Sequence, residues 1–191
     1  TQKISNVPLG FATHDASFDA PTGTVFSITL ELRPFTRDCP PFFKKGEEHR
    51  LNSICQYDVA GKVLSCLAVE DAICHGRPLQ SRGLLHRGTY EPFHVNSFAY
   101  LPSEDSIILI SHVQGTAYKV RRNPVELQWA VGGHGTLSHV DRQGAPLPGA
   151  PFGHIHFFLP MGDDKYVAFD NGNDPDRPQK RVTQSSVTVV K

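Results

Sequence analysis

The sequence predicts an all-β fold, and three observations support this prediction. The chain of 191 residues contains 15 prolines and 16 glycines, which break it into short segments. Its apolar residues fall in short runs rich in β-branched and aromatic side chains. No stretch shows the 3.6-residue periodicity of an amphipathic helix. With 39% hydrophobic and 9% aromatic residues, the composition is that of a globular protein, so we expect a single folded domain with few helices.

Three segments of the chain share one plan, and each begins with a histidine. HDASFDAPTGTVFSITLEL starts at His14, HVNSFAYLPSEDSIILIS at His94 and HIHFFLPMGDDKYVAFDNG at His154. Each predicts a hairpin in which a polar turn follows a short strand and precedes a second apolar strand. A further hairpin is predicted after the first two segments, over 53–69 and 116–133. The repeating unit therefore has four strands, with units at about 14–69, 94–133 and 154–191.

Repetition of a four-stranded unit is typical of a β-propeller, whose blades bury their sheet faces against one another. The third unit ends after one strand of its second hairpin, SSVTVVK, and leaves an apolar edge. A propeller closes its ring with typically about four to eight blades. We therefore expect roughly three blades of a partial propeller, the last incomplete, with the remainder supplied by missing residues or by another chain.

Two segments between these units are rich in proline, glycine and charged residues. They cover residues 34–52 and 70–93, and we expect both to be long loops. Loops of this length in a compact domain are usually functional or mobile. Trp129, on an apolar strand, is expected to be buried between blades.

Charge and hydropathy exclude two classes of partner. Nineteen basic and nineteen acidic residues balance, and no stripe of Lys or Arg is present, so we expect no binding of nucleic acid. No apolar window approaches the roughly 20 residues needed to span a bilayer, so we expect no membrane span.

The chain has four cysteines, and no CxxC pair that would indicate a zinc ribbon or a thioredoxin-like motif. An even number favours disulfides and a secreted or periplasmic location, although free thiols remain an alternative. The pairing cannot be deduced from the sequence. The cysteines are Cys39, Cys55, Cys66 and Cys74.

The repeated histidines are the main candidates for function. In a propeller the first strand of each blade lines the centre, so His14, His94 and either His154 or His156 are expected to converge. Converging imidazoles bind an anion when protonated, ligate a metal when neutral, or supply a nucleophile and a proton donor. A lone histidine in a sheet is more often structural, but recurrence at one place in the unit argues for function. The remaining loop histidines are His49, His75, His86, His134 and His139.

His154 and His156 lie two residues apart and would share one face of a strand, a spacing that suits zinc or copper. No carboxylate or cysteine accompanies them at ligand spacing. We therefore expect no metal and no other cofactor, and a metal-dependent hydrolase is only a third hypothesis for the function.

These segments together resemble the bacterial-type arylsulfate sulfotransferases, a family of six-bladed β-propeller enzymes that use no nucleotide sulfate donor. The resemblance covers most of the chain apart from the two loops, and it implies that the chain forms about half of a six-bladed ring. It is carried by HVNSFAYLPSEDSIILIS, VELQWAVGG, HIHFFLP and KYVAFDNGNDP, and more weakly by THDASFDAPTGTVFSI.

The resemblance implies transfer of a sulfuryl group from an aryl sulfate to a phenol through a sulfohistidine. The family's nucleophile lies on the strand before the FDNG turn, where His156 fits best and His154 is the alternative. His94, Asn96 and His14 would hold the sulfate oxygens. These three side chains are of the types needed to stabilise charge on the oxygens of the transferred group.

The chain departs from the family at His112, which stands where the family has an arginine. Histidine lacks the permanent charge and the two-pronged grip of arginine, so His112 is expected to contact the substrate more weakly. This departure keeps a second hypothesis open, in which the chain is a catalytically inactive propeller that serves as a binding or assembly module.

Overall fold

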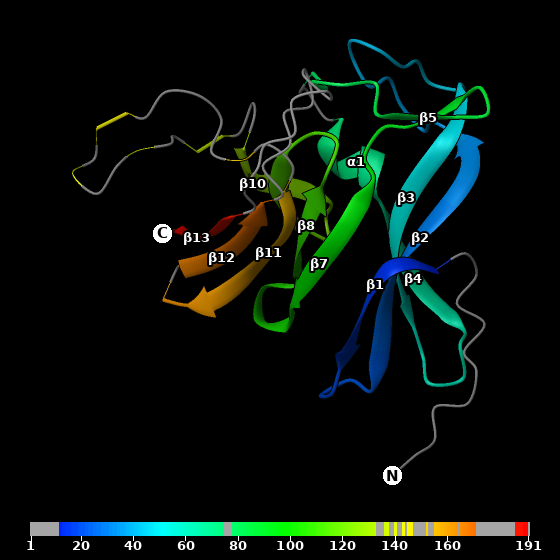
Figure 1. Ribbon diagram of the computed structural model, residues 1–191. Helices are drawn as coiled ribbons and strands as arrows, with labels where there is room; N and C mark the ends of the chain where they lie inside the picture. The colour runs from blue at the N-terminus through cyan, green and yellow to red at the C-terminus, as the bar shows by residue number, and fades with distance from the viewer. Residues whose placement is uncertain are drawn as a thin grey trace.

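The computed structural model describes residues 12–74, 78–132, 136–137, 140, 143, 145–146, 152, 155–163, 165–170 and 186–190. Antiparallel sheets dominate this part of the chain, as predicted (Figure 1). In the first sheet each strand pairs with the next one along the chain. Its strands are β1 (Ala12–Asp19), β2 (Thr24–Pro34), β3 (Glu48–Tyr57) and β4 (Val63–Ala68).

The second and third sheets repeat this arrangement. In the second and third sheets, too, the strands pair in chain order. The first and second sheets each have four strands, which confirms the predicted succession of a histidine hairpin and a further hairpin in these two sheets. The third sheet has three strands in the described residues. The second sheet consists of β7 (Val95–Leu101), β8 (Ser106–Ser111), β9 (Thr116–Arg121) and β10 (Glu126–Gly132). The third sheet consists of β11 (Ile155–Gly162), β12 (Lys165–Asp170) and β13 (Ser186–Val190). A 3-10 turn, η1 (Pro102–Glu104), joins β7 to β8.

The prediction of a loop over 34–52 is wrong at both ends of this range. β2 and β3 remain paired as far as Pro34 and Glu48, which leaves only 35–47 outside the strands. The charged run before Leu51 suggested a loop, but Leu51 is fully buried and draws this end of β3 into the hairpin.

The second predicted loop, 70–93, contains regular structure. It includes most of α1 (Val69–Ile73) and a small hairpin of β5 (Leu84–His86) and β6 (Thr89–Glu91). These elements are too short to give a clear periodicity in the sequence. No helix in the described part of the chain is long and apolar enough to cross a membrane.

The first strands of the three sheets lie side by side. β7 packs against β1 on one side and against β11 on the other, and Figure 1 shows it between them. Each first strand carries or closely follows one of the repeated histidines. The order of the sheets along the chain is therefore also their order in space.

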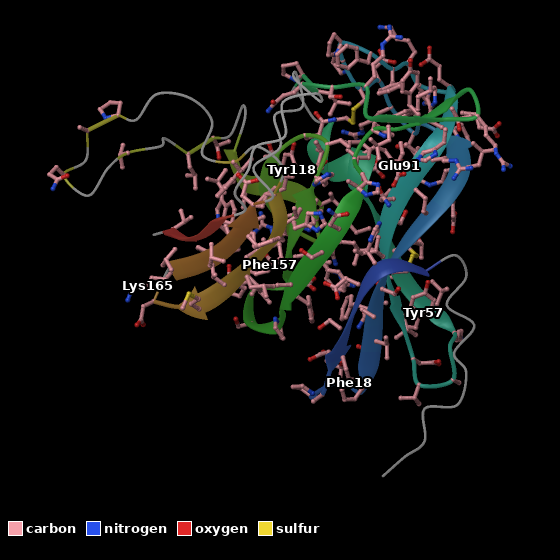
Figure 2. The ribbon with its side chains drawn as sticks, in the orientation of Figure 1. Phe18, Tyr57, Glu91, Tyr118, Phe157 and Lys165 are labelled. Atoms are coloured by element: carbon pink, nitrogen blue, oxygen red, sulfur yellow. A yellow bond between two sulfur atoms is a disulfide. The ribbon has the colours of Figure 1, made fainter. Side chains whose placement is uncertain are left out.

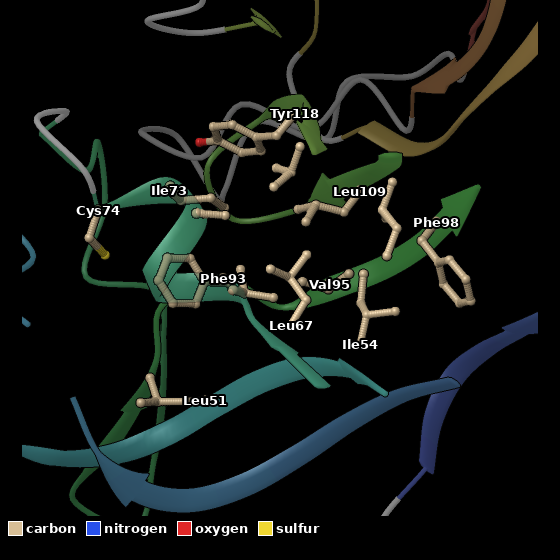
Figure 3. Packing of buried hydrophobic residues seen from close by; sticks show 14 of the residues in the cluster. Leu51, Ile54, Leu67, Ile73, Cys74, Phe93, Val95, Phe98, Leu109 and Tyr118 are labelled. Atoms are coloured by element: carbon tan, nitrogen blue, oxygen red, sulfur yellow. The ribbon is translucent and has the colours of Figure 1, made fainter. Parts of the chain in front are cut away.

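β8 shows why the sheets stack in this way. All six residues of SIILIS are buried, because both faces of the strand are covered. Ile107 and Leu109 pack in the cluster shared with the first sheet, where Figure 3 labels Leu109. Ile108 and Ile110 pack in the cluster shared with the third sheet. Alternate side chains point to opposite faces of a sheet, so a continuous apolar run is what a doubly covered strand requires. Trp129, which was expected to be buried, is only partly buried and packs against the second of these clusters.

The outward face of the third sheet is also apolar. Its cross-strand rows are Phe157, Phe169 and Val187, and then Leu159, Val167 and Val189. Phe158 and Ala168, which point to the opposite face, belong to the cluster shared with the second sheet. In the outward rows Val187 is 67% exposed and Val189 59% exposed.

Arg122 joins the first and second sheets at the end remote from the histidines. Its guanidinium donates hydrogen bonds to Gln56 Oε1 at 2.8 Å and to Ser65 Oγ at 2.7 Å. The same group lies 5.0 Å from the centre of the Phe26 ring and forms an ion pair with Asp105 at 3.2 Å. Gln56, Ser65 and Phe26 belong to the first sheet, so Arg122 ties the second sheet to the first at this end.

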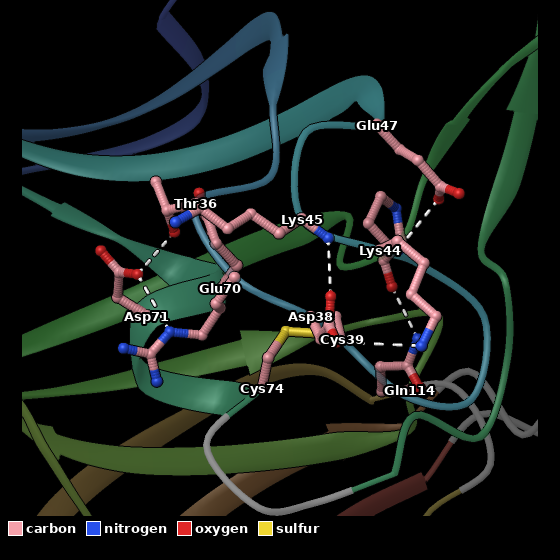
Figure 4. The surroundings of a disulfide bond; sticks show 12 residues. Thr36, Asp38, Cys39, Lys44, Lys45, Glu47, Glu70, Asp71, Cys74 and Gln114 are labelled. Carbon is pink, nitrogen blue, oxygen red and sulfur yellow. Dashed lines mark hydrogen bonds and ion pairs between the residues drawn. A yellow bond between two sulfur atoms is a disulfide. The ribbon is translucent and has the colours of Figure 1, made fainter.

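The four cysteines form two disulfides. Cys55 and Cys66 face each other on β3 and β4, so their bond staples one hairpin. The bond between Cys39 and Cys74 joins the 35–47 segment to the end of α1, and its surroundings include the ion pair of Arg37 with Asp71 (Figure 4).

Loss of each disulfide should lower the free energy of unfolding by a different amount. The Cys39–Cys74 bond closes a loop of 35 residues and the Cys55–Cys66 bond a loop of 11. Loop-closure entropy then predicts losses of about 4 and about 3 kcal/mol, respectively. Urea unfolding of the two paired Cys→Ala variants measures this difference. A larger loss for the Cys55–Cys66 pair would contradict the entropic explanation.

Candidate functional site

The structure brings together four histidines from three sheets. The ring centres of His14 and His94 are 5.0 Å apart, those of His94 and His112 5.7 Å, and those of His112 and His156 5.0 Å. The rings thus form a continuous line from β1 across the β7–β8 hairpin to β11. The predicted convergence of His14, His94 and His156 is therefore present, and His112 lies between two of them.

The first strand of each sheet has an irregular pairing at or beside its histidine. The pairing register shifts between Ala12 and Ala16 in β1, between Val95 and Ser97 in β7, and between Ile155 and Phe157 in β11. The shift inserts one extra residue in β7 and in β11 and two in β1, and such a bulge re-aims the side chain of the inserted residue.

Two of the histidines also have unusual backbone conformations. His14 has φ of +62° and His94 has φ of +43°, both in the left-handed region that costs energy for a residue with a Cβ. These residues keep such conformations only because the surrounding structure holds them there. The contacts that hold them are therefore part of the site.

Side-chain hydrogen bonds tie the first strands together next to the histidines. Asp15 Oδ2 accepts a hydrogen bond from the backbone N–H of Phe98 at 3.3 Å, which links β1 to β7. Ser97 Oγ donates to the backbone carbonyl of His156 at 3.1 Å, which links β7 to β11. The histidines of three sheets therefore have fixed relative positions.

Asn96 is the residue inserted at the β7 bulge, and its amide has no partner among the described residues. The residue is 8% exposed, yet neither its Nδ2 nor its Oδ1 makes a hydrogen bond there. A buried amide without a partner costs free energy, so its presence calls for an explanation such as a bound ligand. Asn96 was predicted to bind substrate, and an anionic oxygen would be a partner for Nδ2.

Glu91 is a site residue that the sequence did not indicate, because it falls in a segment predicted to be a loop. Its side chain is 5% exposed, and Oε1 lies 3.0 Å from Nδ1 of His94. Figure 2 labels Glu91 where the small hairpin leads into β7, and Phe157 on the third sheet. Only the proximity of Glu91 to His94 in the sequence, three residues apart, could have suggested the contact.

His112 takes a bridging position in the line of rings. Its Nδ1 lies 3.4 Å from the backbone carbonyl oxygen of Ile155, and its backbone N–H donates to the carbonyl of His94 at 3.1 Å. It therefore contacts both His94, directly before β7, and the first residue of β11. His112 directly follows β8 in the chain.

The pKa of His14 is lowered from its ordinary value of 6.5. Burial is the largest cause, and charge on His94 and then His156 acts in the same direction, whereas Glu91 opposes the shift. The His14 ring therefore stays neutral down to a lower pH than the ring of a free histidine does. A neutral imidazole accepts a proton, which suits a general base.

The other predicted residues lie apart from this line or outside the described residues. His154, His75, His134 and His139 fall outside them, as does the FDNG turn after Asp170. His49 packs in an aromatic cluster with Phe35, Phe43 and Tyr90, where burial lowers its pKa. Within the described residues no three His, Cys, Asp or Glu side chains are grouped so as to hold a metal ion.

Comparison with known proteins gives no identification, because no family model matches the chain and no curated protein matches its sequence.

Replacement of Asn96 by leucine should raise stability and weaken anion binding. The exchange removes a buried amide that has no partner among the described residues and keeps its approximate shape, so the free energy of unfolding should rise by about 1–3 kcal/mol. Urea unfolding and isothermal titration with sulfate measure the two effects. A destabilised variant with unchanged sulfate affinity would contradict this view of Asn96.

The stability of the protein should depend on pH partly through His14. Well above pH 6.5 the ring is neutral in both the folded and the unfolded chain and contributes nothing. As the pH falls below 6.5, the unfolded chain binds the proton first, so stability is lost until the pH passes below the lowered folded pKa. Urea unfolding at several pH values measures this effect. For each protein the free energy of unfolding is compared with its own value at about pH 8, and it should fall less steeply with pH in His14→Asn than in the wild type. Parallel curves for both proteins would contradict the assignment.

Proposed function

We propose that the three sheets are blades of a β-propeller and that the chain forms about half of a six-bladed ring. The remaining blades would come from further residues or from another chain. The pairing of strands in chain order and the side-by-side packing of β1, β7 and β11 support this proposal. The apolar outward face of the third sheet is the surface on which the next blade would pack.

We further propose that the site catalyses sulfuryl transfer from an aryl sulfate to a phenol, without a nucleotide sulfate donor. The observation that carries this proposal is the line of four imidazoles, together with the amide of Asn96, which lies two residues after His94 and has no partner among the described residues. A sulfate monoester presents three oxygens that need donors and a sulfur that needs a nucleophile. Imidazoles and an amide supply both, and the site requires no cofactor for this chemistry.

In the proposed reaction His156 is the nucleophile. A lone pair on its ring nitrogen forms the N–S bond, while the S–O bond to the aryl group breaks and its electrons pass to the phenolate oxygen. A protonated neighbouring imidazole gives its proton to this oxygen. The acceptor phenol then loses its proton to a neutral imidazole, for which His14 is suited by its lowered pKa, and its oxygen takes the sulfuryl group from His156.

His94, Asn96 and His14 would hold the oxygens of the sulfuryl group, and His112 would replace the family's arginine. The ring of His112 lies between those of His94 and His156, where it can reach a group bound to either. A histidine donates from both nitrogens only when it is protonated. The grip on sulfate should therefore be weaker and more dependent on pH than with an arginine.

The second candidate function is a binding or assembly module that has lost the reaction. Two observations favour it: the presence of His112 in place of an arginine, and the exposed apolar rows of the third sheet. Exposed apolar patches often mark protein interfaces. In either case the two disulfides support our proposal of a secreted or periplasmic location.

Incubation with p-nitrophenyl sulfate and a phenol should release nitrophenolate and sulfate the phenol. In the absence of acceptor, mass spectrometry should find one added sulfuryl group on the peptide that contains His156. His156→Asn should abolish both signals, whereas His49→Asn, outside the line of histidines, should retain them. If the wild-type protein binds sulfate but shows no transfer, with the remaining blades present, the binding module is the better account.

A further inference from the structure

Glu91 has a place beside the site that the proposed reaction does not yet use. Its side chain is buried at 5% exposure, and its two oxygens face different histidines. Oε1 lies 3.0 Å from Nδ1 of His94, and Oε2 lies 3.9 Å from Nε2 of His86, which is half exposed on the small hairpin. A buried carboxylate with its best contact to a candidate catalytic ring invites a functional explanation.

The chain from Glu91 to His94 is held rigidly by the second sheet. Gln114 Nε2 donates to the carbonyl of Pro92 at 2.6 Å, and the hydroxyl of Ser111 donates to the carbonyl of Phe93. The backbone N–H of His112 donates to the carbonyl of His94, as described above. Three consecutive carbonyls are thus fixed by groups at the end of β8 and in the turn after it.

The small hairpin restrains the other side of Glu91. Gly83, directly before this hairpin, lies so close to the backbone of Glu91 that a Cβ at position 83 would be 2.1 Å from the carbonyl oxygen of Glu91. Glycine is required there also because its φ is +84°. The backbones of Glu91 and His94 are therefore held by separate contacts, and the contact between the two side chains orients the ring on this fixed backbone.

An ionised carboxylate only accepts hydrogen bonds, so the nitrogen that faces it must carry a hydrogen. For His94 this nitrogen is Nδ1, which leaves Nε2 as the nitrogen available to a ligand. We propose that Glu91 is a positioning residue: it fixes the tautomer and the orientation of the His94 ring so that Nε2 faces the bound anion. The inference rests on the proposed function for the nature of that anion.

A purely structural role makes a different prediction. If Glu91 only satisfies buried groups, its replacement would change stability and leave the chemistry of the folded site intact. A positioning role changes the state of the His94 ring itself. An amide in place of the carboxylate can present either an N–H or an oxygen, so it no longer dictates which nitrogen of His94 carries the hydrogen.

The direct test is the ¹⁵N spectrum of the His94 imidazole in the wild-type protein, assigned by comparison with His94→Asn. At a pH where the ring is neutral, we expect the hydrogen on Nδ1. In Glu91→Gln we expect a mixture of tautomers. Glu104→Gln is the matched control, because Glu104 pairs with Lys119 on the surface and lies outside the line of histidines. A wild-type ring with its hydrogen on Nε2 would overturn the proposal, even if the variant does not fold.

Activity provides a second readout. In Glu91→Gln the kcat for sulfuryl transfer should fall by about 10- to 100-fold, while Glu104→Gln retains the wild-type value. An unchanged kcat in a folded Glu91→Gln protein would count against the proposal. If the wild-type protein transfers no sulfuryl group while His94 carries its hydrogen on Nδ1, the proposed function fails and the positioning of His94 by Glu91 stands.

Discussion

The packing of β7 between β1 and β11 is the contact on which the rest of the structure depends. It makes the stacked sheets share two apolar clusters, and it brings their histidine-bearing ends to one place. Apolar packing alone would tolerate small sliding movements between sheets. The hydrogen bonds of Asp15 to the N–H of Phe98 and of Ser97 to the carbonyl of His156 fix the register across both interfaces.

Local rules of β-structure are broken where the site lies. His14 and His94 adopt left-handed backbone conformations, and the amide of Asn96 is buried without a partner among the described residues. Each feature costs free energy that the two apolar clusters and the disulfides offset. Such a concentration of costs at one place is typical of a functional site, where the folded chain is optimised for a ligand and not for stability alone.

The repeated pattern of the sequence predicted the sheets and much of the site, because strand alternation and turn residues are local properties. The position of a histidine at the head of each hairpin was enough to expect His14, His94 and either His154 or His156 together. Glu91 could not be predicted, since its contact with His94 depends on how the 70–93 segment folds back on the second sheet. The start of β3 was predicted too late in the chain for a similar reason: burial of Leu51 by tertiary contacts outweighs the charged residues before it.

The central claim is that imidazoles from three sheets form a single anion site. Titration with sulfate, followed through the imidazole resonances of His14, His94 and His156, tests it most directly. A common site predicts that all three resonances shift with the same dissociation constant, and that Asn96→Leu weakens the three shifts together. Shifts with different constants, or a response from one ring alone, would contradict the account.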